Sequence, residues 1–350
     1  MSRGAPRPGR RGGWLKGFLV LIFLLPALVG IPGVLAYTWV DHQLHQPANP
    51  GGGKVRFVVA PGSSLHEVAD TLHRAGLIDS TLVFDLYARY RHLDRGVEAG
   101  AYELARNLNM EQILMALQTA RPEELFVTIP EGYTIKKTAA ALDKGGLIKG
   151  ADYIAAAVPA GYKYDFLKDL PAGLSLEGFL FPDTYLVPRN ATAKQLIQLQ
   201  LDEFAKNWTA ARKAQAAQRG LNALQIVTIA SMIEREARFD DDRPKVASVI
   251  YNRLARGMLL QIDATVLYAK GVWQSSVTYD DRKINSPYNT YLHTGLPPGP
   301  IANPGLKAID AALQPAQTDF LYYVSDPQGH NHYAKTSDEF AQLLKKYGLQ

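Results

Sequence analysis

Residues Leu224–Gly271 read LQIVTIASMIEREARFDDDRPKVASVIYNRLARGMLLQIDATVLYAKG and set one carboxylate, Glu234, in a run that is otherwise apolar or small. Apolar residues recur at helical spacing over Leu221–Arg238 and over Pro244–Leu254, which predicts two helices. Because burial in apolar surroundings disfavours the ionised form of a carboxyl, Glu234 is expected to stay protonated toward neutral pH. A protonated carboxyl is what a general acid needs, so Glu234 is the first candidate catalytic residue.

A second carboxylate, Glu236, lies two positions further along the same helix, about 200° around its axis from Glu234. The two therefore cannot act as a pair from one helix face. Small residues line the face of Glu234 and are expected to leave room for a substrate, whereas the side of Glu236 is bulkier and is predicted to be core. For either glutamate a structural ion pair is the open alternative, because Arg235, Arg238 and Arg253 are available.

The composition limits the classes of function. The 350 residues include no cysteine, 47% are hydrophobic, and the formal net charge is +5. Residues 1–16 carry five basic and no acidic side chains, which leaves 33 basic and 33 acidic residues in the rest of the chain. The basic balance thus belongs to the N-terminal tail and gives no support for nucleic-acid binding. Without cysteine, disulfides, thiol catalysis and thiolate metal sites are excluded.

An uncharged apolar segment, Gly17–Val40, predicts a membrane anchor. About 20 apolar residues suffice for a spanning helix, whereas the apolar core of a cleaved signal peptide, the alternative, is roughly 7–15 residues long. Because basic residues precede the segment, the positive-inside rule predicts one pass through the inner membrane, with the tail 1–16 in the cytoplasm and the remainder outside.

An internal repeat follows a Gly- and Pro-containing linker over 41–53. Phe57–Ile78 (FVVAPGSSLHEVADTLHRAGLI) aligns with Phe126–Ile148 (FVTIPEGYTIKKTAAALDKGGLI) when one inserted residue is allowed. Each copy predicts a short strand, a Pro/Gly turn, an amphipathic helix and a Gly stop. We therefore expect two related α+β units, the first within a module over 54–123 and the second over 124–190, before a catalytic core over 191–347.

Further elements are predicted along the chain. Helices are expected near Met110–Leu117, at Ala193–Asn207 and at Ser337–Tyr347, a strand at Phe320–Ser325, and loops between Lys283 and Pro304. The fold class is therefore α+β behind a single membrane helix.

Two segments combine groups that suit sugar hydroxyls. Gln261, Asp263 and Thr265 alternate, so they would share one face of an extended segment. The segment Tyr288–Tyr291 (YNTY) combines aromatic rings with amide and hydroxyl groups, and Tyr288, Asn289 and Thr290 are its candidate sugar ligands. The polar side of an edge strand and an ordinary turn are the respective alternatives. His330 and His332 are interpreted as surface or hydrogen-bonding residues, and no metal or other cofactor is predicted.

Known catalytic motifs built on GxSxG, Walker A, GxGxxG or HExxH are absent from the sequence, which leaves carboxylate chemistry and hence glycosidic bonds. At this point the motifs IASMIEREAR, GMLLQIDATVLYAKG, YNTYLHTGLPPGPIANPG and FLYYVSDPQGHNHYAKT, with SLEGFLFPDTY, IPEGYTI and AGAYEL upstream, resemble the endolytic murein transglycosylases of the YceG-like (MltG) family. The resemblance covers about residues 55–345. It implies a LysM-like first module and a downstream lyase domain whose catalytic acid is the first Glu of the motif, Glu234. Ile262 and Ala264 depart from the family's Gln-Thr-Asp-Pro-Thr-Val.

The resemblance also implies a reaction and partners. Glu234 would protonate the MurNAc–GlcNAc β-1,4 bond, and the C6 hydroxyl of the same MurNAc would close a 1,6-anhydro ring, so no second carboxylate is required. Nascent peptidoglycan strands near penicillin-binding synthases would be the substrate. The rival hypothesis is a non-catalytic, membrane-anchored scaffold that binds peptidoglycan.

Overall fold

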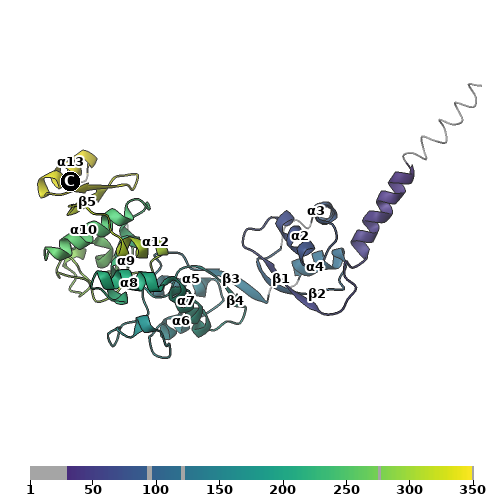
Figure 1. Ribbon diagram of the computed structural model, residues 1–350, viewed down its shortest axis with the longest axis horizontal. Coiled ribbons are helices and arrows are strands. Elements are labelled where there is room, and N and C mark those ends of the chain that lie inside the picture. Colours follow the sequence, from purple (N-terminus) through teal and green to yellow (C-terminus); the bar gives the residue numbers. More distant parts are fainter. Residues whose placement is uncertain (1–29, 93–96, 120–122, 275–276, 349–350) are drawn as a thin grey trace, which may run out of the picture. The chain divides into compact units, whose positions relative to one another are not determined.

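The computed structural model describes residues 30–92, 97–119, 123–274 and 277–348. The chain divides into two compact units, Met1–Phe126 and Val127–Gln350, and each is described by itself (Figure 1).

The first unit folds in the order strand, helix, helix, strand, helix. Its elements are β1 (Lys54–Val59), α2 (Leu65–Arg74), α3 (Thr81–Tyr90), β2 (Gly100–Ala105) and α4 (Met110–Thr119). β1 pairs antiparallel with β2, with Phe57 opposite Tyr102, and both side chains enter the core. Ser64 begins α2 with a capping box to Glu67, which satisfies backbone N–H groups that a helix start leaves free.

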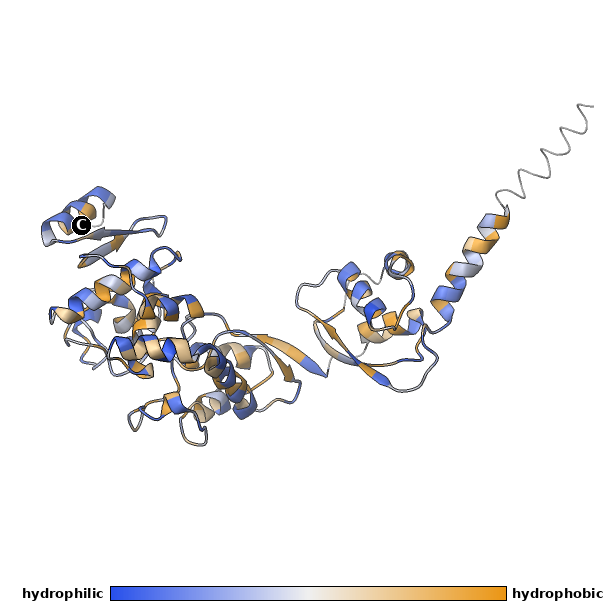
Figure 2. Cartoon of the chain, viewed as in Figure 1, coloured by the Kyte–Doolittle hydropathy of each residue, from blue (hydrophilic) through white to orange (hydrophobic). Residues whose placement is uncertain are grey.

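Before this unit, residues 30–45 are helical. Hydrophobic residues predominate in the N-terminal part of this helix and hydrophilic residues at its C-terminal end (Figure 2). Tyr37 and Trp39 are 72% and 50% exposed, so they have no core to pack into. None of the helices over the described residues is long and apolar enough to cross a membrane, and the predicted span Gly17–Val40 lies largely outside those residues.

The second copy of the repeat forms β3 (Glu124–Thr128) and α5 (Ile135–Lys144). The strand, turn, helix and Gly stop predicted for both copies are confirmed, because Gly76 and Gly146 end the two helices with φ of +67° and +66°. β3 lies beside β4 (Thr184–Pro188), and the hydroxyls of Thr128 and Thr184 are 2.9 Å apart. The helix α6 (Gly150–Ala156) and the 3₁₀ turn Asp165–Leu167 lie between them in the chain.

The rest of the second unit is helical and has α9 (Ala223–Glu236) at its centre. The neighbours of α9 are α8 (Ala210–Gln218), α10 (Arg243–Ala255), α11 (Asp263–Lys270) and α12 (Leu306–Leu313). Its residues from Ile226 to Ile233 are buried on every side, which explains the almost unbroken apolar run in the sequence. Another helix, α7 (Ala193–Asn207), has the bounds that the sequence predicts.

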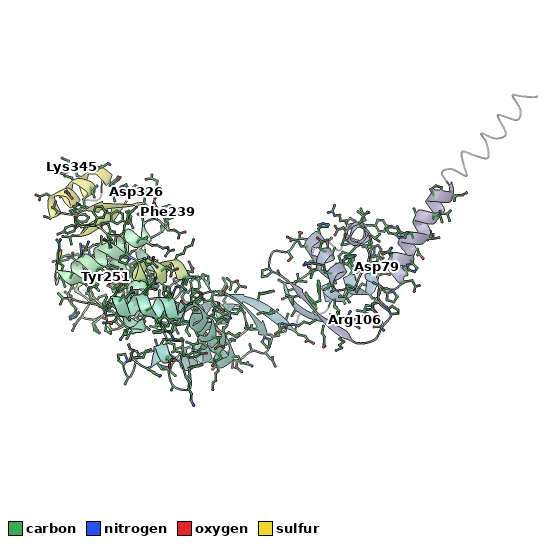
Figure 3. The ribbon with its side chains drawn as sticks, in the orientation of Figure 1. Asp79, Arg106, Phe239, Tyr251, Asp326 and Lys345 are labelled. Atoms are coloured by element: carbon green, nitrogen blue, oxygen red, sulfur yellow. The ribbon has the colours of Figure 1, made fainter. Side chains whose placement is uncertain are left out.

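A hairpin and a helix complete this unit. β5 (Tyr322–Ser325) pairs antiparallel with β6 (Asn331–Ala334), and α13 (Ser337–Tyr347) packs on both strands. The predicted strand near Phe320–Ser325 and the last helix are confirmed. Phe239, which follows α9 and is labelled in Figure 3, stacks on His330 of this hairpin with ring centroids 3.9 Å apart.

The extended segment predicted through Gln261, Asp263 and Thr265 is wrong. Gln261 has a positive φ of 52°, and α11 begins at Asp263. A carboxylate in the first turn of a helix is favoured by the helix dipole, and this local preference competes with strand formation. The three side chains therefore do not share a strand face.

Candidate functional site

A cavity of about 520 Å³ opens at the C-terminal end of α9, and Glu236 lines it. Its other walls come from Arg253 at the end of α10, the segment Leu260–Asp263 that leads into α11, the residues Arg282 and Tyr291, strand β5 and helix α13. The cavity is thus assembled from residues far apart in the sequence.

The Glu236 carboxylate is held by two donors. The hydroxyl of Tyr323 on β5 donates to Oε2 at 2.8 Å, and the backbone N–H of Ala264 in the first turn of α11 also donates to the carboxylate. Burial raises the pKa of Glu236 above its usual range, and the negative charge of Asp263 acts in the same direction, while the hydrogen bond from Tyr323 lowers it. A carboxyl with a raised pKa beside open space has the properties of a general acid.

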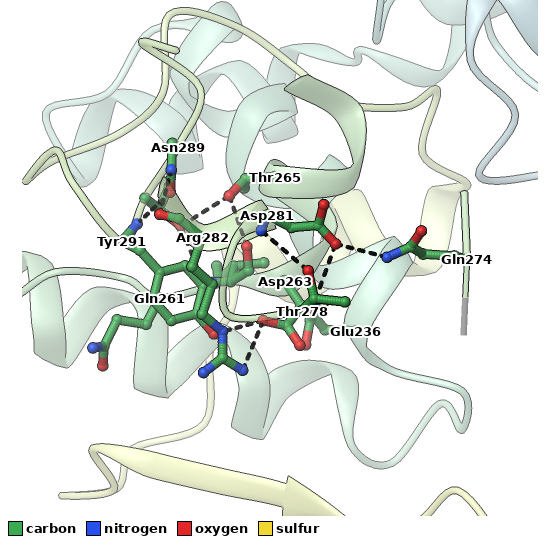
Figure 4. Close-up of polar contacts among 12 residues, drawn as sticks. Glu236, Gln261, Asp263, Thr265, Gln274, Thr278, Asp281, Arg282, Asn289 and Tyr291 are labelled. Atoms are coloured by element: carbon green, nitrogen blue, oxygen red, sulfur yellow. Dashed lines mark hydrogen bonds and ion pairs between the residues drawn. The ribbon is translucent and has the colours of Figure 1, made fainter. Parts of the chain in front are cut away.

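Asp263 faces the same cavity with partners of its own (Figure 4). The Tyr291 hydroxyl donates to its Oδ1 at 2.5 Å, and the Arg282 guanidinium lies 3.8 Å from the same oxygen. Arg282 also lies over the Tyr291 ring, with 4.8 Å between the guanidinium carbon and the ring centroid. A carboxylate, a guanidinium and a phenol are therefore fixed together on one wall.

Gln261 occupies the cavity because Arg253 fixes the chain beneath it. The Arg253 guanidinium donates to the carbonyls of Leu260 and Leu321 at 2.8 and 2.6 Å, and to the side-chain oxygen of Gln261 at 3.2 Å. Arg253 is 7% exposed, so these carbonyls replace the water that it loses. Arg253, one of the arginines available for an ion pair with a glutamate, instead contacts backbone carbonyls, Gln261 and the ring of Tyr322.

Three predicted sugar-binding residues lie inside the protein instead of on the cavity wall. Thr265 and Thr290 are 0% and 1% exposed, and their hydroxyls are 2.9 Å apart. Asn289 is 0% exposed and donates to the carbonyls of Arg282 and Ile284. Their polar groups are hydrogen-bonded within the fold and do not face the cavity.

Tyr288 also departs from the prediction. It does not line the cavity of Glu236 but packs against Tyr268, with ring centroids 5.0 Å apart. Of the six predicted substrate-binding residues, only Gln261 and Asp263 line that cavity.

The open space lies on the other side of α9 from the one that the sequence predicts. Glu234 was expected to border a groove in apolar surroundings, yet its side chain is 8% exposed and pairs with Arg243 at 3.0 Å. Its Oε2 also accepts the backbone N–H of Gly305 at 3.1 Å. The surroundings of Glu234 are therefore polar, and the bulky side expected to be core is where the cavity opens.

Glu131 from IPEGYTI is a neighbour of Glu234. A Cβ at Gly305 would overlap the Glu131 carboxylate, which shows how closely the two segments approach. Burial raises the pKa of Glu131, and the charge of Glu234 adds to this rise. The cluster joins α9, α10, the start of α12 and the turn before α5.

The two histidines near the C-terminus have hydrogen-bonding and stacking partners. His332 Nε2 lies 2.9 Å from Asp326 Oδ2, and its Nδ1 lies 3.1 Å from the Tyr347 hydroxyl. Within the described ranges, no group of three or more His, Asp or Glu side chains is arranged to hold a metal ion.

The sequence-based prediction missed Tyr323 and Arg282. Tyr291 belongs to the YNTY segment that was predicted to suit sugars, and it lines the cavity; Tyr323 stands in the predicted strand. The available signal was the alternation of Tyr322 and Tyr323 across that strand, which puts one of them on the inner face. Nothing local in the sequence indicates that this face meets Glu236.

Comparisons with known proteins agree with this architecture. A family model described as the YceG-like family matches residues 57–346. An endolytic murein transglycosylase of Bacillus subtilis (strain 168) is 33% identical over 305 residues, which are 84% of this chain and 84% of that protein. A protein of the same name from Streptococcus pneumoniae (strain ATCC BAA-255 / R6) is 33% identical over 93% of this chain, but the chain spans 64% of that longer protein. A crystal structure of a yceG-like protein from Listeria monocytogenes has a TM-score of 0.61 at 32% identity and covers 83% of this chain.

Proposed function

Because the chain belongs to the YceG-like family, we propose that it is a lytic transglycosylase that cleaves the glycan strands of peptidoglycan. The observation that carries the proposal is the cavity at the end of α9. There the carboxyl of Glu236, whose pKa burial raises, faces open space beside Gln261, Asp263 and aromatic rings. Aromatic faces and polar rims suit pyranose rings, which offer apolar faces edged by hydroxyls.

We propose Glu236, in place of Glu234, as the catalytic acid. Glu234 is engaged by Arg243 and by the N–H of Gly305, and its side chain has little exposed surface. Glu236 has space beside it for a reacting bond. Glu234 then acts as a positioning residue that fixes the end of α9 against α10 and α12.

The proposed reaction uses one carboxyl twice. Protonated Glu236 gives its proton to the oxygen that links C1 of MurNAc to GlcNAc, and the C1–O bond breaks with positive charge spread over C1 and the ring oxygen. The C6 hydroxyl of the same MurNAc then attacks C1, and its proton passes to the Glu236 carboxylate. The products are a 1,6-anhydro-MurNAc end and a free GlcNAc 4-hydroxyl, and no water is consumed. Because the nucleophile belongs to the substrate, no second carboxylate is needed to activate it.

Product analysis tests the reaction type. Peptidoglycan digested with the full chain should yield anhydro-MurNAc ends that increase with time. Reducing MurNAc ends in their place would make the protein a hydrolase, with Asp263 as the second carboxylate. A lack of either product, with retained binding to glycan, would favour the rival scaffold function.

We further propose that the enzyme cuts nascent strands close to the membrane, beside the synthases that make them. The apolar segment Gly17–Val40 and the exposed apolar side chains of the helix over 30–45 support a single-pass anchor with the catalytic unit outside the inner membrane. The short linker over 41–53 would hold the first unit near that surface. In cells, Glu236→Gln should abolish strand release while the protein still binds glycan, whereas a scaffold would be indifferent to this change.

A further inference from the structure

A second cavity, of about 620 Å³, lies in the second unit and shares no lining residue with the cavity of Glu236. Its walls come from the N-terminal turn of α5, from α6, from Ser175 and Glu177 ahead of β4, and from the C-terminal end of α11. Nothing in the proposed reaction uses it.

Two aromatic side chains border this cavity, Tyr268 on α11 and Trp273 just beyond its end. The Arg235 guanidinium lies over the Trp273 ring, with its carbon 4.1 Å from the centroid, and thereby covers one face of the indole. Tyr268 is braced by Tyr288. Both rings are thus held at the cavity wall by neighbours behind them.

The polar lining of the cavity consists of Glu177 together with Thr134, Lys136, Lys137 and Ser175. The Glu177 carboxyl is 6% exposed and accepts the N–H of Ile135 at 3.0 Å and the side-chain amide of Asn303 at 3.0 Å. Burial raises its pKa to about 8, so near neutral pH it carries a proton that it can donate. The hydroxyl of Tyr268 lies 3.5 Å from Glu177 Oε2. Apolar walls with a small set of fixed donors and acceptors characterise sites for small polar rings such as sugars.

The helix α11 connects this cavity to the reaction site. Its first residue, Asp263, lines the cavity of Glu236, while Tyr268 and Gly271 at its other end line the second cavity. The helix has eight residues, so its ends are about 12 Å apart. Arg235, which lies over Trp273, is also the chain neighbour of Glu236. A ligand of several linked rings could therefore contact both cavities at once.

We propose that the second cavity is a saccharide subsite that holds the glycan strand several sugars away from the bond that is cut. The inference rests on the proposed function and extends it to the length of the substrate. A strand long enough to reach Trp273 gains binding free energy there, whereas a short oligosaccharide at Glu236 does not. The enzyme should therefore favour internal bonds of long strands.

Binding to the full-length Glu236→Gln protein separates this inference from catalysis. The probes are purified uncross-linked glycan strands and a GlcNAc–MurNAc tetrasaccharide. Trp273→Ala in this background should weaken binding of long strands about tenfold, as expected when a central aromatic anchor is removed, and leave tetrasaccharide binding unchanged. Val272→Ala is the matched control, because Val272 is 54% exposed and does not line the cavity. Trp273→Phe keeps an aromatic ring and should therefore retain part of the affinity that Trp273→Ala loses. Such partial retention would show that the loss comes from the missing ring and not from misfolding.

The outcomes are distinguishable. Equal binding of long strands by the Trp273→Ala protein and its parent would overturn the subsite, as would an equal loss for both probes, because the residue would then serve the Glu236 site alone. Trp273-dependent binding of long strands, in a protein whose wild type forms no anhydro ends, would support the subsite and refute the proposed function.

Discussion

Two glutamates only two positions apart on α9 have different surroundings. Glu234 is paired with Arg243, whereas Glu236 contacts Tyr323 and faces a cavity. Residues two positions apart on a helix point about 200° away from each other. The end of α9 can therefore hold Glu234 in an ion pair and direct Glu236 toward the cavity.

Tyr323 should tune the acidity of Glu236. Its hydroxyl donates to Glu236 and lowers the pKa of that carboxyl, against the rise caused by burial. In Tyr323→Phe the pKa of Glu236 should rise further, so the alkaline limb of the rate–pH profile should move to higher pH. The profile is measured from the release of anhydro-MurNAc ends at each pH, with Tyr322→Phe on the same strand as the control. A limb that stays in place, or moves to lower pH, would contradict this contact.

The sequence could separate the two glutamates but not assign their roles. Helical periodicity places them on different sides of α9, and that separation is confirmed by their different partners. Which side opens is decided by Tyr323 and Arg243, one from a strand 87 residues away and one from the next helix. The bulky apolar residues beside Glu236 predicted that this side of the helix is core. Helical periodicity depends only on local sequence, so it contains no information about a cavity that the distant strand β5 helps to form.

At the scale of elements, the turn before β4 depends on a glycine. Gly178 has φ of +89°, its N–H donates to Asn303 at 2.8 Å, and a Cβ would lie 2.7 Å from Val227 Cγ1 on α9 and closer still to Pro300. The same Asn303 also binds Glu177 and the carbonyl of Tyr133. The turn therefore joins α9 to the wall of the second cavity, which Glu177 lines.

Gly178→Ala should lower the free energy of unfolding by about 2–4 kcal/mol, the sum of left-handed backbone strain and a forced overlap. Gly173→Ala is the matched control, since Gly173 has nearly the same φ, +88°, but open space around it. It should lose only the strain, about 1–2 kcal/mol. Denaturant unfolding of the three proteins measures the difference, and equal losses would show that the close approach to Val227 and Pro300 is unimportant.

Helices with strong local signals were predicted well, and the segment between them was not. α7 and α13 begin after Thr192 and Thr336, whose side chains cap the first turn, and their bounds match the sequence prediction. Residues 261–265 alternate like a strand, but Gln261 hydrogen bonds to Thr290, and the chain turns into α11 there. The tertiary contact overrides the local pattern. Of the six predicted sugar ligands, two line the cavity.

At the scale of the whole molecule, the second unit should lose stability as pH rises. Glu177 has a pKa of about 8 in the fold against 4.5 as its ordinary value, because burial disfavours its charge. A raised carboxyl pKa contributes stability that is complete below pH 4.5 and is lost as pH rises through about 8. Glu177→Gln keeps an acceptor for Ile135 and cannot ionise, so its unfolding free energy should vary less over that range. If wild type and variant show the same pH dependence, Glu177 does not titrate as described.

The membrane anchor is tested in cells by comparing the full chain with a truncated one. Without residues 1–40, the protein should move from the membrane fraction to the soluble fraction, because the uncharged segment Gly17–Val40 is removed. Replacing that segment with an unrelated apolar helix of equal length is the control and should restore membrane recovery. A truncated protein that stays with the membrane would mean that another part of the chain attaches it.

The most direct test of the central claim compares Glu236→Gln with Glu234→Gln. Each protein is first shown to be folded by its melting curve, and each then digests peptidoglycan while anhydro-MurNAc ends are counted. Glu236→Gln should lose at least about a thousandfold in rate, as expected when the general acid of a glycosidic cleavage is removed. Glu234→Gln should melt earlier, because Arg243 loses its charged partner, yet keep most of its activity while folded. Near-normal product formation by Glu236→Gln, with none from a folded Glu234→Gln, would contradict the account.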